Sequence, residues 1–336
     1  MNLVTTVTAN ATVDKTYRLD RFEPGTLMRV HQMESVPGGK GINVARVLRR
    51  LGHPALATGF VAGFSGAWIR HRLDQEGIWH DFVEVDGESR LSVTIPNPDG
   101  RGQTEILEPG PAINPDDQLA LISVVERWAR QSRCVVLAGS LPPGAFPDLY
   151  ARIIRTVQAA GTPVALDASG EALRLGIAAH PFLVKPNRRE LAALGLPPGL
   201  PGSVPGAAGR QALRALAEAW ARLAQAEWFI VTAGEEGALA VCRRVDRGGG
   251  QGAGQDLPSF EFFWATPPEV TPVNPVGSGD AFLGGLLAGM LEGRDAAGCL
   301  RLASAAAAAN VMVMGAGMID RKIVQRLEEH VTVEAI

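Results

Sequence analysis

The chain has 336 residues, of which 46% are hydrophobic and 20% charged, an ordinary composition for one large globular domain with a small appendage. Its formal net charge of −3 gives no reason to expect a nucleic-acid-binding or membrane-surface protein. Three widely separated cysteines indicate free thiols in a reducing compartment, and six scattered histidines show no metal-ligand spacing.

Two segments bear on location. The opening residues MNLVTTVTANATVDK lack the basic and apolar regions of a signal peptide, so we expect a cytoplasmic protein. Residues 302–319 carry no charge and resemble a membrane span in that respect alone. Because their alanines gain little from lipid, they favour a buried helix that runs into a strand or turn.

Short β-branched runs alternate with amphipathic helical patterns along the chain. The predicted buried strands are 3–9, 55–61, 134–138, 164–167, 182–184 and 228–232. Helices are predicted over 115–130, 147–160 and 207–226, the first with an apolar stripe of Leu119, Ile122, Val125 and Trp128. This alternation implies crossover connections, so we predict an α/β fold with a mostly parallel sheet covered on both faces.

Residues 12–36 and 81–108 break this alternation with polar, strand-like runs. SRLSVTI (89–95) and QTEILEP (103–109) flank PNPDGRG, which has the composition of a hairpin turn. We predict that the two segments form a small antiparallel sheet beside the main one, in the position of a lid. The Gly/Pro-rich stretches 195–210 and 247–258 are interpreted as surface insertions within a single domain spanning 1–336.

The first motif with chemical potential is PGGKGINVARVLRRLG, residues 37–52. It predicts a helix with one apolar face and an opposite face carrying Arg46, Arg49 and Arg50, ended by Gly52. Its glycines carry no side chain that would cover the backbone at the helix start, so a ligand can approach there, and Asn43 could bind sugar hydroxyls. It is not a P-loop, because no glycine precedes Gly39 at the spacing that GxxxxGK[ST] requires. An ordinary helix start with a loose turn is the alternative.

A second motif, LVKPNRREL, covers residues 183–191. A buried strand ends at Val184 and Pro186 prevents it from continuing. Lys185, Asn187 and Glu190 would then lie at the carboxyl end of the strand, where open α/β sheets bind ligands. Asn187 and Glu190 also have the spacing of a helix-capping pair, a role expected whatever the function.

A third motif, VNPVGSGDAFLGGLLAGML, covers residues 273–291. Gly277, Ser278 and Gly279 can expose successive N–H groups at a helix start, which favours an anion there. Asp280, in the first turn, is placed to take a proton from a nucleophile beside a bound phosphate. The alternative is an Asp-capped turn before a close-packed, glycine-rich helix.

Together these motifs resemble the PfkB branch of the ribokinase family over nearly the whole chain. GGKGINVARVLRRLG resembles the first family signature and NPVGSGDAF the second. LAGSLPPG (137–144), LDASGEAL (166–173), KPNRREL (185–191) and VTAGEEGAL (231–239) stand in the expected order between them. The most similar subgroup comprises 1-phosphofructokinases, tagatose-6-phosphate kinases and minor 6-phosphofructokinases, from which Ala11 departs where proline is usual.

The resemblance implies a three-layer α/β/α ribokinase-like domain with a β lid, ATP and Mg²⁺ as cofactors, and a hexose phosphate as acceptor. It implies Asp280 as the catalytic base and Gly277, Ser278 and Gly279 as an anion hole. The residues implied to bind the sugar phosphate are Asp14, Arg29, Gly38, Gly39, Lys40, Asn43, Arg90 and Ser140. Those implied to bind ATP are Lys185, Asn187, Thr232, Gly234, Gly237 and Ser304, with Glu190 organising Mg²⁺ through water.

Other functions are weighed against this one. A kinase of an unphosphorylated sugar or nucleoside would not need the lid arginines, and a non-catalytic sugar-phosphate sensor would not need Asp280. A dinucleotide-dependent dehydrogenase is excluded because no GxGxxG follows the first strand. A lid with an exposed apolar face also predicts a homodimer through the lid, without nucleic-acid or membrane partners.

Overall fold

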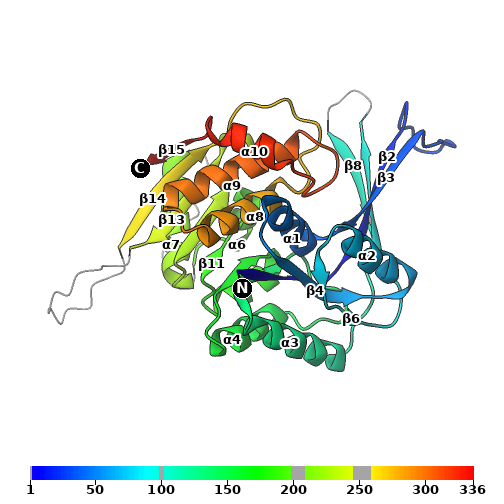
Figure 1. The fold of residues 1–336 in the computed structure, drawn as a ribbon, viewed down its shortest axis with the longest axis horizontal. Helices are drawn as coiled ribbons and strands as arrows, with labels where there is room; N and C mark the ends of the chain where they lie inside the picture. The colour runs from blue at the N-terminus through cyan, green and yellow to red at the C-terminus, as the bar shows by residue number, and fades with distance from the viewer. Residues whose placement is uncertain (1, 98–101, 198–208, 245–258) are drawn as a thin grey trace.

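The computed structural model describes residues 2–97, 102–197, 209–244 and 259–336. The 247–258 stretch and most of 195–210, interpreted above as insertions, lie outside these residues. Within them, two sheets carry the fold: a large central sheet and a small sheet at one end of it (Figure 1).

The central sheet has eleven strands within the described residues, in the order β15-β14-β13-β12-β11-β10-β9-β1-β4-β5, with β6 also paired to β4. Their bounds are β1 (Leu3–Thr8), β4 (Ala55–Val61), β5 (Trp79–His80), β6 (Val83–Glu84), β9 (Ser132–Ala138), β10 (Val164–Asp167), β11 (Leu183–Val184), β12 (Trp228–Thr232), β13 (Ala238–Arg243), β14 (Phe260–Thr266) and β15 (Thr332–Ala335). Every predicted strand is present. Strands β12 to β5 pair in parallel, and β13 to β15 continue the sheet antiparallel.

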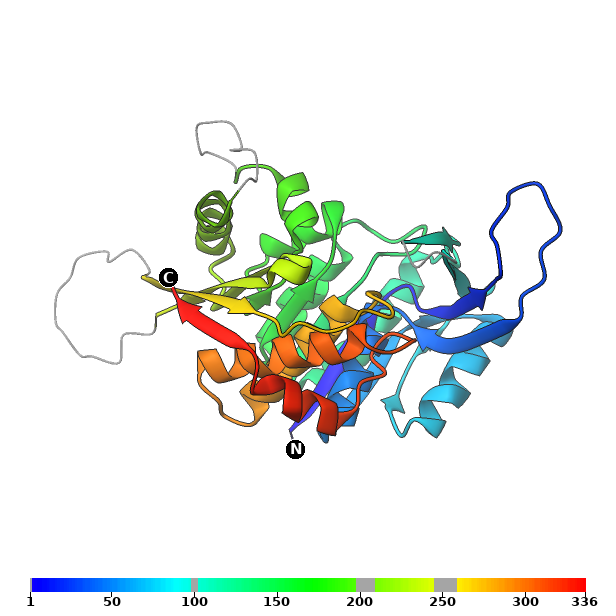
Figure 2. The ribbon, with the colours of Figure 1, turned by 90° about the horizontal axis from the view of Figure 1, so that it is seen from above.

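Helices cover both faces of this sheet, as the alternation predicts (Figure 2). One layer contains α1 (Lys40–Leu51), α2 (Gly63–Gln75), α8 (Ser278–Leu291), α9 (Ala296–Val311) and α10 (Arg321–Glu328). The other contains α3 (Pro115–Ala129), α4 (Leu149–Ala159), α5 (Gly170–Ile177), α6 (Arg188–Leu194) and α7 (Arg210–Ala224). The three helices predicted from periodicity are confirmed within a few residues. Among the described residues, no helix has the length and apolar character required to span a bilayer.

The predicted apolar stripe of α3 is wrong in detail. Its buried residues are Gln118, Leu121, Val125 and Ala129, whereas Leu119 is 59% exposed. Gln118 can face inward because its amide is fully employed there: Nε2 donates to the Asn114 and Gly144 carbonyls, and Oε1 accepts from the Phe146 N–H. A polar residue whose hydrogen bonds are satisfied is therefore buried at a helix position that the apolar periodicity did not predict to be buried.

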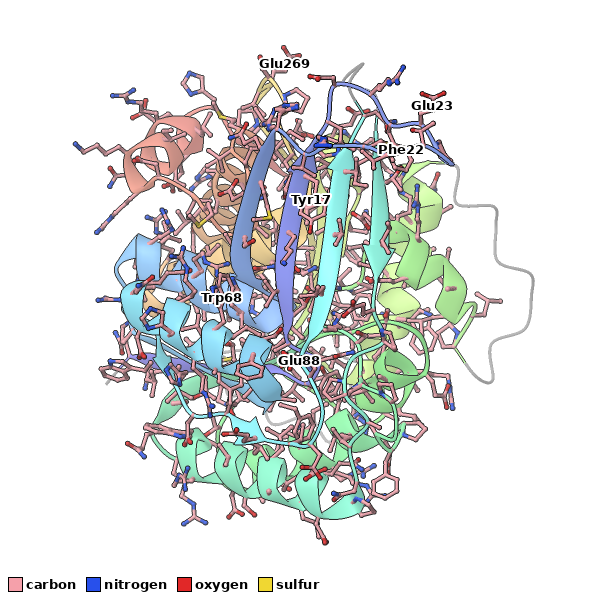
Figure 3. All side chains as sticks on the ribbon, turned by 90° about the vertical axis from the view of Figure 1, so that its right-hand side faces the viewer. Tyr17, Phe22, Glu23, Trp68, Glu88 and Glu269 are labelled. Carbon is pink, nitrogen blue, oxygen red and sulfur yellow. The ribbon has the colours of Figure 1, made fainter. Side chains whose placement is uncertain are left out.

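The small sheet is formed by the two segments predicted as a lid, in the order β3-β2-β7-β8 (Figure 3). Its strands are β2 (Thr12–Arg18), β3 (Gln32–Gly38), β7 (Arg90–Pro96) and β8 (Gln103–Leu107). The second segment forms the predicted antiparallel hairpin and the first forms one as well, but β2 and β7 pair in parallel, so the sheet is not wholly antiparallel as predicted. Both strands leave the carboxyl edge of the central sheet in the same direction, after β1 and after β6, so the two hairpins meet with their first strands parallel.

Candidate active site

A cleft of about 1120 Å³ lies where the carboxyl ends of the parallel strands meet the lid. Residues that follow β1, β9, β10, β11 and β12 line it, together with the first turns of α1 and α8. This is the edge at which open α/β sheets bind ligands, because chain direction and helix N-termini converge there.

The first turn of α8 forms one wall of the cleft. Gly277 precedes it with a φ of 79°, and a Cβ at this position would lie 2.5 Å from the Ala316 Cβ. Only glycine satisfies both conditions, and its absent side chain leaves the backbone beside Ser278 and Gly279 open to the cleft. The Ser278 N–H donates to the Pro275 carbonyl at 3.2 Å, so an anion at this helix N-terminus would be held by the N–H groups of Gly277 and Gly279.

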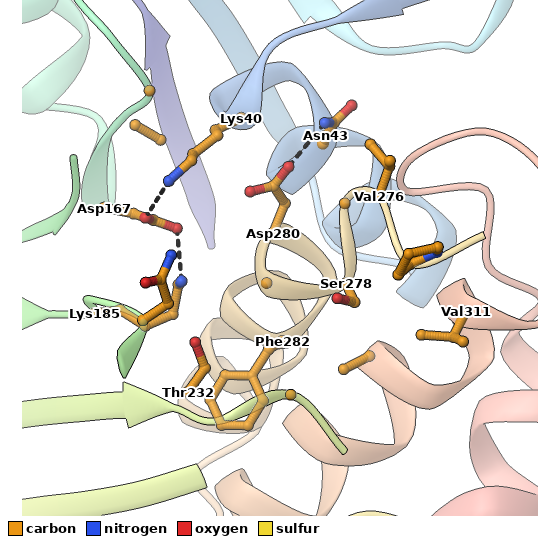
Figure 4. Close-up of a pocket in the computed structure, with 18 of the residues that line it drawn as sticks. Lys40, Asn43, Asp167, Lys185, Thr232, Val276, Ser278, Asp280, Phe282 and Val311 are labelled. Carbon is orange, nitrogen blue, oxygen red and sulfur yellow. Dashed lines mark hydrogen bonds and ion pairs between the residues drawn. The ribbon is translucent and has the colours of Figure 1, made fainter. Parts of the chain in front are cut away.

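Asp280 lies in this same turn and is 6% exposed. Its Oδ2 accepts a hydrogen bond of 2.8 Å from the Asn43 Nδ2, across 237 residues of sequence (Figure 4). Burial, and then the charge of Asp167, raise the pKa of Asp280 to about 7, against the opposite influence of Lys40, the Asn43 hydrogen bond and Lys185. A carboxylate whose pKa lies close to neutral pH is suited to accept a proton during a reaction and release it afterwards.

Opposite Asp280, one carboxylate holds two lysines. Asp167, at the end of β10, is fully buried and lies 2.9 Å from the Lys40 Nζ and 2.8 Å from the Lys185 Nζ (Figure 4). Burial opposes ionisation of Asp167, but Lys185 and Lys40 outweigh it and keep its pKa low. The sequence prediction did not include Asp167 among the site residues. Its position as the last residue of a predicted buried strand was the signal, because such residues face the ligand edge.

Asn187 and Glu190 form the predicted cap of α6. The Asn187 Oδ1 accepts from the Glu190 N–H at 2.8 Å, and the Glu190 Oε2 accepts from the Asn187 N–H at 2.8 Å. The second carboxylate oxygen of Glu190 lies 3.5 Å from the Lys40 Nζ. Among the described residues, no group of three or more His, Cys, Asp or Glu side chains could enclose a metal ion. A metal here would therefore need water and substrate oxygens in addition to these carboxylates.

The lid end of the cleft presents Asp14 and Arg90. Burial raises the pKa of Asp14 to about 6, although Arg90 and Arg46 favour its ionised form. A Cβ at Gly38 would lie 2.1 Å from the Asp14 Oδ2, so Gly38 makes room for this carboxylate without lining the cleft itself. The Arg90 Nε donates to the Asn10 carbonyl at 3.2 Å. Asn10 is a further lining residue that sequence reasoning missed.

The far end of the cleft is more apolar. Phe282 and Val311 face it together with Thr232 (Figure 4). Ser304 also lines the cleft. The proline-rich segment 267–272 also lines the cleft and was not predicted to contribute. The apolar lining of this end suits a weakly polar part of a ligand.

Most of the predicted site residues meet in this one cleft: Asp14, Gly39, Lys40, Asn43, Arg90, Ser140, Lys185, Asn187, Glu190, Thr232, Gly234, Gly237, Gly277, Ser278, Gly279, Asp280 and Ser304. Arg29 is not brought to it. This residue is exposed in the turn between β2 and β3, and no residue of that turn lines the cleft of the same chain.

Comparison with known proteins agrees with this geometry. A family model described as pfkB family carbohydrate kinase matches residues 7–322. The chain is 25% identical to phosphofructokinase-2 from Escherichia coli in complex with fructose-6-phosphate, with 98% of this chain and 99% of that chain covered and a TM-score of 0.83. The tetrameric inhibited form of that enzyme gives the same identity and coverage with a TM-score of 0.81. Arabidopsis thaliana ribokinase complexed with ribose and ATP, at 23% identity, 97% and 98% coverage and a TM-score of 0.70, shares the fold.

Proposed function

This chain belongs to the pfkB family of carbohydrate kinases, and we propose that it transfers the γ-phosphoryl group of ATP to a hydroxyl of a hexose phosphate. The acceptors that fit are fructose 6-phosphate, fructose 1-phosphate and tagatose 6-phosphate, each giving a bisphosphate. Support from comparison comes from the Escherichia coli phosphofructokinase-2, whose structure was determined with fructose-6-phosphate.

The observation that carries this proposal is the position of Arg90. Its guanidinium lies in the cleft beside Asp14, at the end opposite the apolar wall. Apart from the Nε bond to Asn10, its nitrogens have no hydrogen-bond or ion-pair partner among the described residues. A planar fork with free N–H groups matches a phosphate, whereas a free sugar requires only neutral hydrogen-bonding groups.

In the proposed reaction, Asp280 accepts the proton of the sugar hydroxyl as that oxygen attacks the γ-phosphorus. The new oxygen–phosphorus bond forms while the bond between the γ-phosphorus and the β,γ-bridging oxygen breaks, and ADP leaves with that oxygen. The N–H groups of Gly277 and Gly279 stabilise the negative charge on the transferred group, since the Ser278 N–H already donates to the Pro275 carbonyl. Lys40 and Lys185 add positive charge on the opposite side, held in place by Asp167.

The carboxylates near these lysines fit Mg²⁺ in the way such sites usually do, with one or two carboxylates and the remaining positions filled by water and phosphate oxygens. Glu190 and Asp167 would hold the ion through water, since their own oxygens are already engaged with N–H groups and lysines. When bound, Mg²⁺ neutralises charge on the phosphates of ATP.

The test is an ADP-release assay with the three hexose phosphates and the corresponding free sugars. Arg90→Ala should raise KM for the preferred sugar phosphate by about ten- to a hundredfold, the worth of one or two charge-assisted hydrogen bonds, with KM for ATP unchanged. Arg90→Lys should restore only part, because a point charge lacks the fork. Arg18→Ala, in the same sheet but outside the cleft, is the matched control.

A wild-type preference for free fructose, ribose or a nucleoside over every hexose phosphate would overturn the assignment of substrate. It would favour a kinase of unphosphorylated acceptors. Sugar-phosphate binding without any ATP turnover would instead favour a non-catalytic regulator.

A further inference from the structure

Arg46 is buried, although the sequence predicted it on the polar face of its helix. The helical pattern of α1 places it on the solvent face with Arg49 and Arg50, but its side chain is 1% exposed. The two neighbouring arginines are exposed as expected. Burying a guanidinium is costly unless every donor is paired, so a buried arginine in this position calls for a reason.

All five N–H donors of Arg46 are used. Nε and one Nη2 hydrogen pair with Glu76 at 2.5 and 3.3 Å. The other Nη2 hydrogen bonds the Pro37 carbonyl at 2.7 Å, and Nη1 bonds the Asn43 Oδ1 at 3.1 Å and the Ala316 carbonyl at 2.9 Å. The guanidinium has no capacity left, which makes it a cross-link between four segments of the chain.

The bond to Asn43 fixes which way that amide faces. Arginine can only donate, so the Asn43 oxygen must face Arg46. The Asn43 nitrogen then necessarily faces Asp280, to which it donates at 2.8 Å. Without Arg46, the amide could rotate and present its oxygen to the carboxylate, replacing an attraction by a repulsion.

The two hydrogen bonds that Arg46 donates to backbone carbonyls also involve residues close to this site. Pro37 is in β3, next to the glycines that join the lid to α1, so this bond ties the base of the lid to the helix. Ala316, whose carbonyl accepts from Arg46, packs against Gly277, a residue that lines the cleft. One side chain thus touches the lid base, the support of the anion hole and the partner of Asp280.

We propose that Arg46 is a positioning residue for phosphoryl transfer, which orients Asn43 toward Asp280 and holds the lid base and residue 316 against the same helix. The inference rests on the proposed function, since it assigns Asp280 a proton to accept. Arg46 itself touches neither substrate nor reacting atoms.

The informative variant is Arg46→Lys, which keeps the charge and loses the fork. We expect kcat to fall about ten- to a hundredfold, the cost of slight misplacement of a reacting group, with KM for ATP nearly unchanged. The acidic limb of the kcat–pH profile should move about one pH unit upward, because a hydrogen bond to the ionised form of Asp280 lowers its pKa and its loss raises it. The other groups that face Asp280, namely Lys40, Asp167 and Lys185, are unchanged in the variant.

Arg49→Lys is the matched control, since it makes the same substitution one turn along on α1. Arg49 is exposed, and among the described residues its side chain donates only to the carbonyl of Gly77, the residue after Glu76. Its profile should coincide with that of the wild type. In a double-mutant cycle, Arg46→Lys should add little to Asn43→Ala, because both remove the same hydrogen bond to Asp280.

An Arg46→Lys enzyme with unchanged kcat and pH profile, or an effect fully additive with Asn43→Ala, would overturn the proposal and leave Arg46 a purely structural residue. If Arg46→Lys does not fold, Glu76→Gln gives the same readout, with a smaller upward shift expected and no shift contradicting the idea. The assays use whichever acceptor the wild type phosphorylates fastest. Failure on hexose phosphates alone therefore counts against the substrate assignment and not against Arg46.

Discussion

Asp280→Asn is expected to slow turnover and, at the same time, to stabilise the folded chain by an amount that increases from about pH 4 to about pH 7. The change preserves size and removes basicity, so kcat should fall by about 10²–10⁴-fold, the usual contribution of a general base. The gain in stability arises because the ionised base destabilises the folded state: burial and the charge of Asp167 disfavour an ionised carboxylate at this position.

The size of the gain follows from the pKa of Asp280, which is raised from 3.8 to about 7 on folding. Each pH unit of this difference corresponds to about 1.4 kcal/mol. Because the folded state holds the proton more tightly than the unfolded state, ionisation of Asp280 does not lower stability below about pH 4 and lowers it increasingly up to pH 7. The loss relative to an uncharged side chain is about 2 kcal/mol at pH 5 and about 4 kcal/mol at pH 8.

Urea unfolding of the variant and the wild type at both pH values tests this reasoning. The difference in unfolding free energy between the two proteins should increase by about 2–3 kcal/mol from pH 5 to pH 8, while pH-independent packing effects cancel. Asp86→Asn, at an exposed position, is the control and should show no such trend. A difference that does not change with pH, or that shrinks as pH rises, would refute the burial argument. A near-normal kcat would remove Asp280 from the mechanism.

Three further expectations concern the surroundings of the site. Asp167→Asn should cost about 3–5 kcal/mol of unfolding free energy, because it leaves the buried Lys185 without its carboxylate and Lys40 with Glu190 alone. It should also move the acidic limb of the kcat–pH profile downward, and an upward move would contradict this. Gly284→Ala should destabilise the fold by up to about 2 kcal/mol in thermal unfolding, since its Cβ would lie 2.5 Å from the Val47 Cγ1. This overpacking outweighs the gain of about 1 kcal/mol in helix propensity. An unchanged melting temperature would show that α1 and α8 move apart at little cost in free energy. The lid carries exposed apolar side chains, including Met33 and Ile106, which predicts a homodimer in sedimentation at micromolar concentration, and a monomer there would count against it.

Much of the fold was predictable because it is encoded in short-range patterns. Strands such as β4 are runs of apolar residues that are buried along their whole length, and the Asn187–Glu190 pair forms a capping box from residues three apart. The helix starts at α1 and α8 were visible for the same reason, since a glycine-rich turn before a helix needs only local dihedral freedom. The cleft itself followed from the parallel order of the strands, because their carboxyl ends share one edge.

What the sequence by itself determined was therefore the class of fold, the positions of the predicted strands and helices, and part of the cleft lining. Only the tertiary structure decided which charges share the site. Lys40 meets Asp167 across 127 residues and Arg46 meets Ala316 across 270, and no local pattern specifies such pairs. The burial of Arg46 has the same origin, because the segments that cover its helix face come from β3, the end of α2 and the turn after α9. A residue's environment depends on chain segments brought together by packing, and periodicity along one helix carries no information about them.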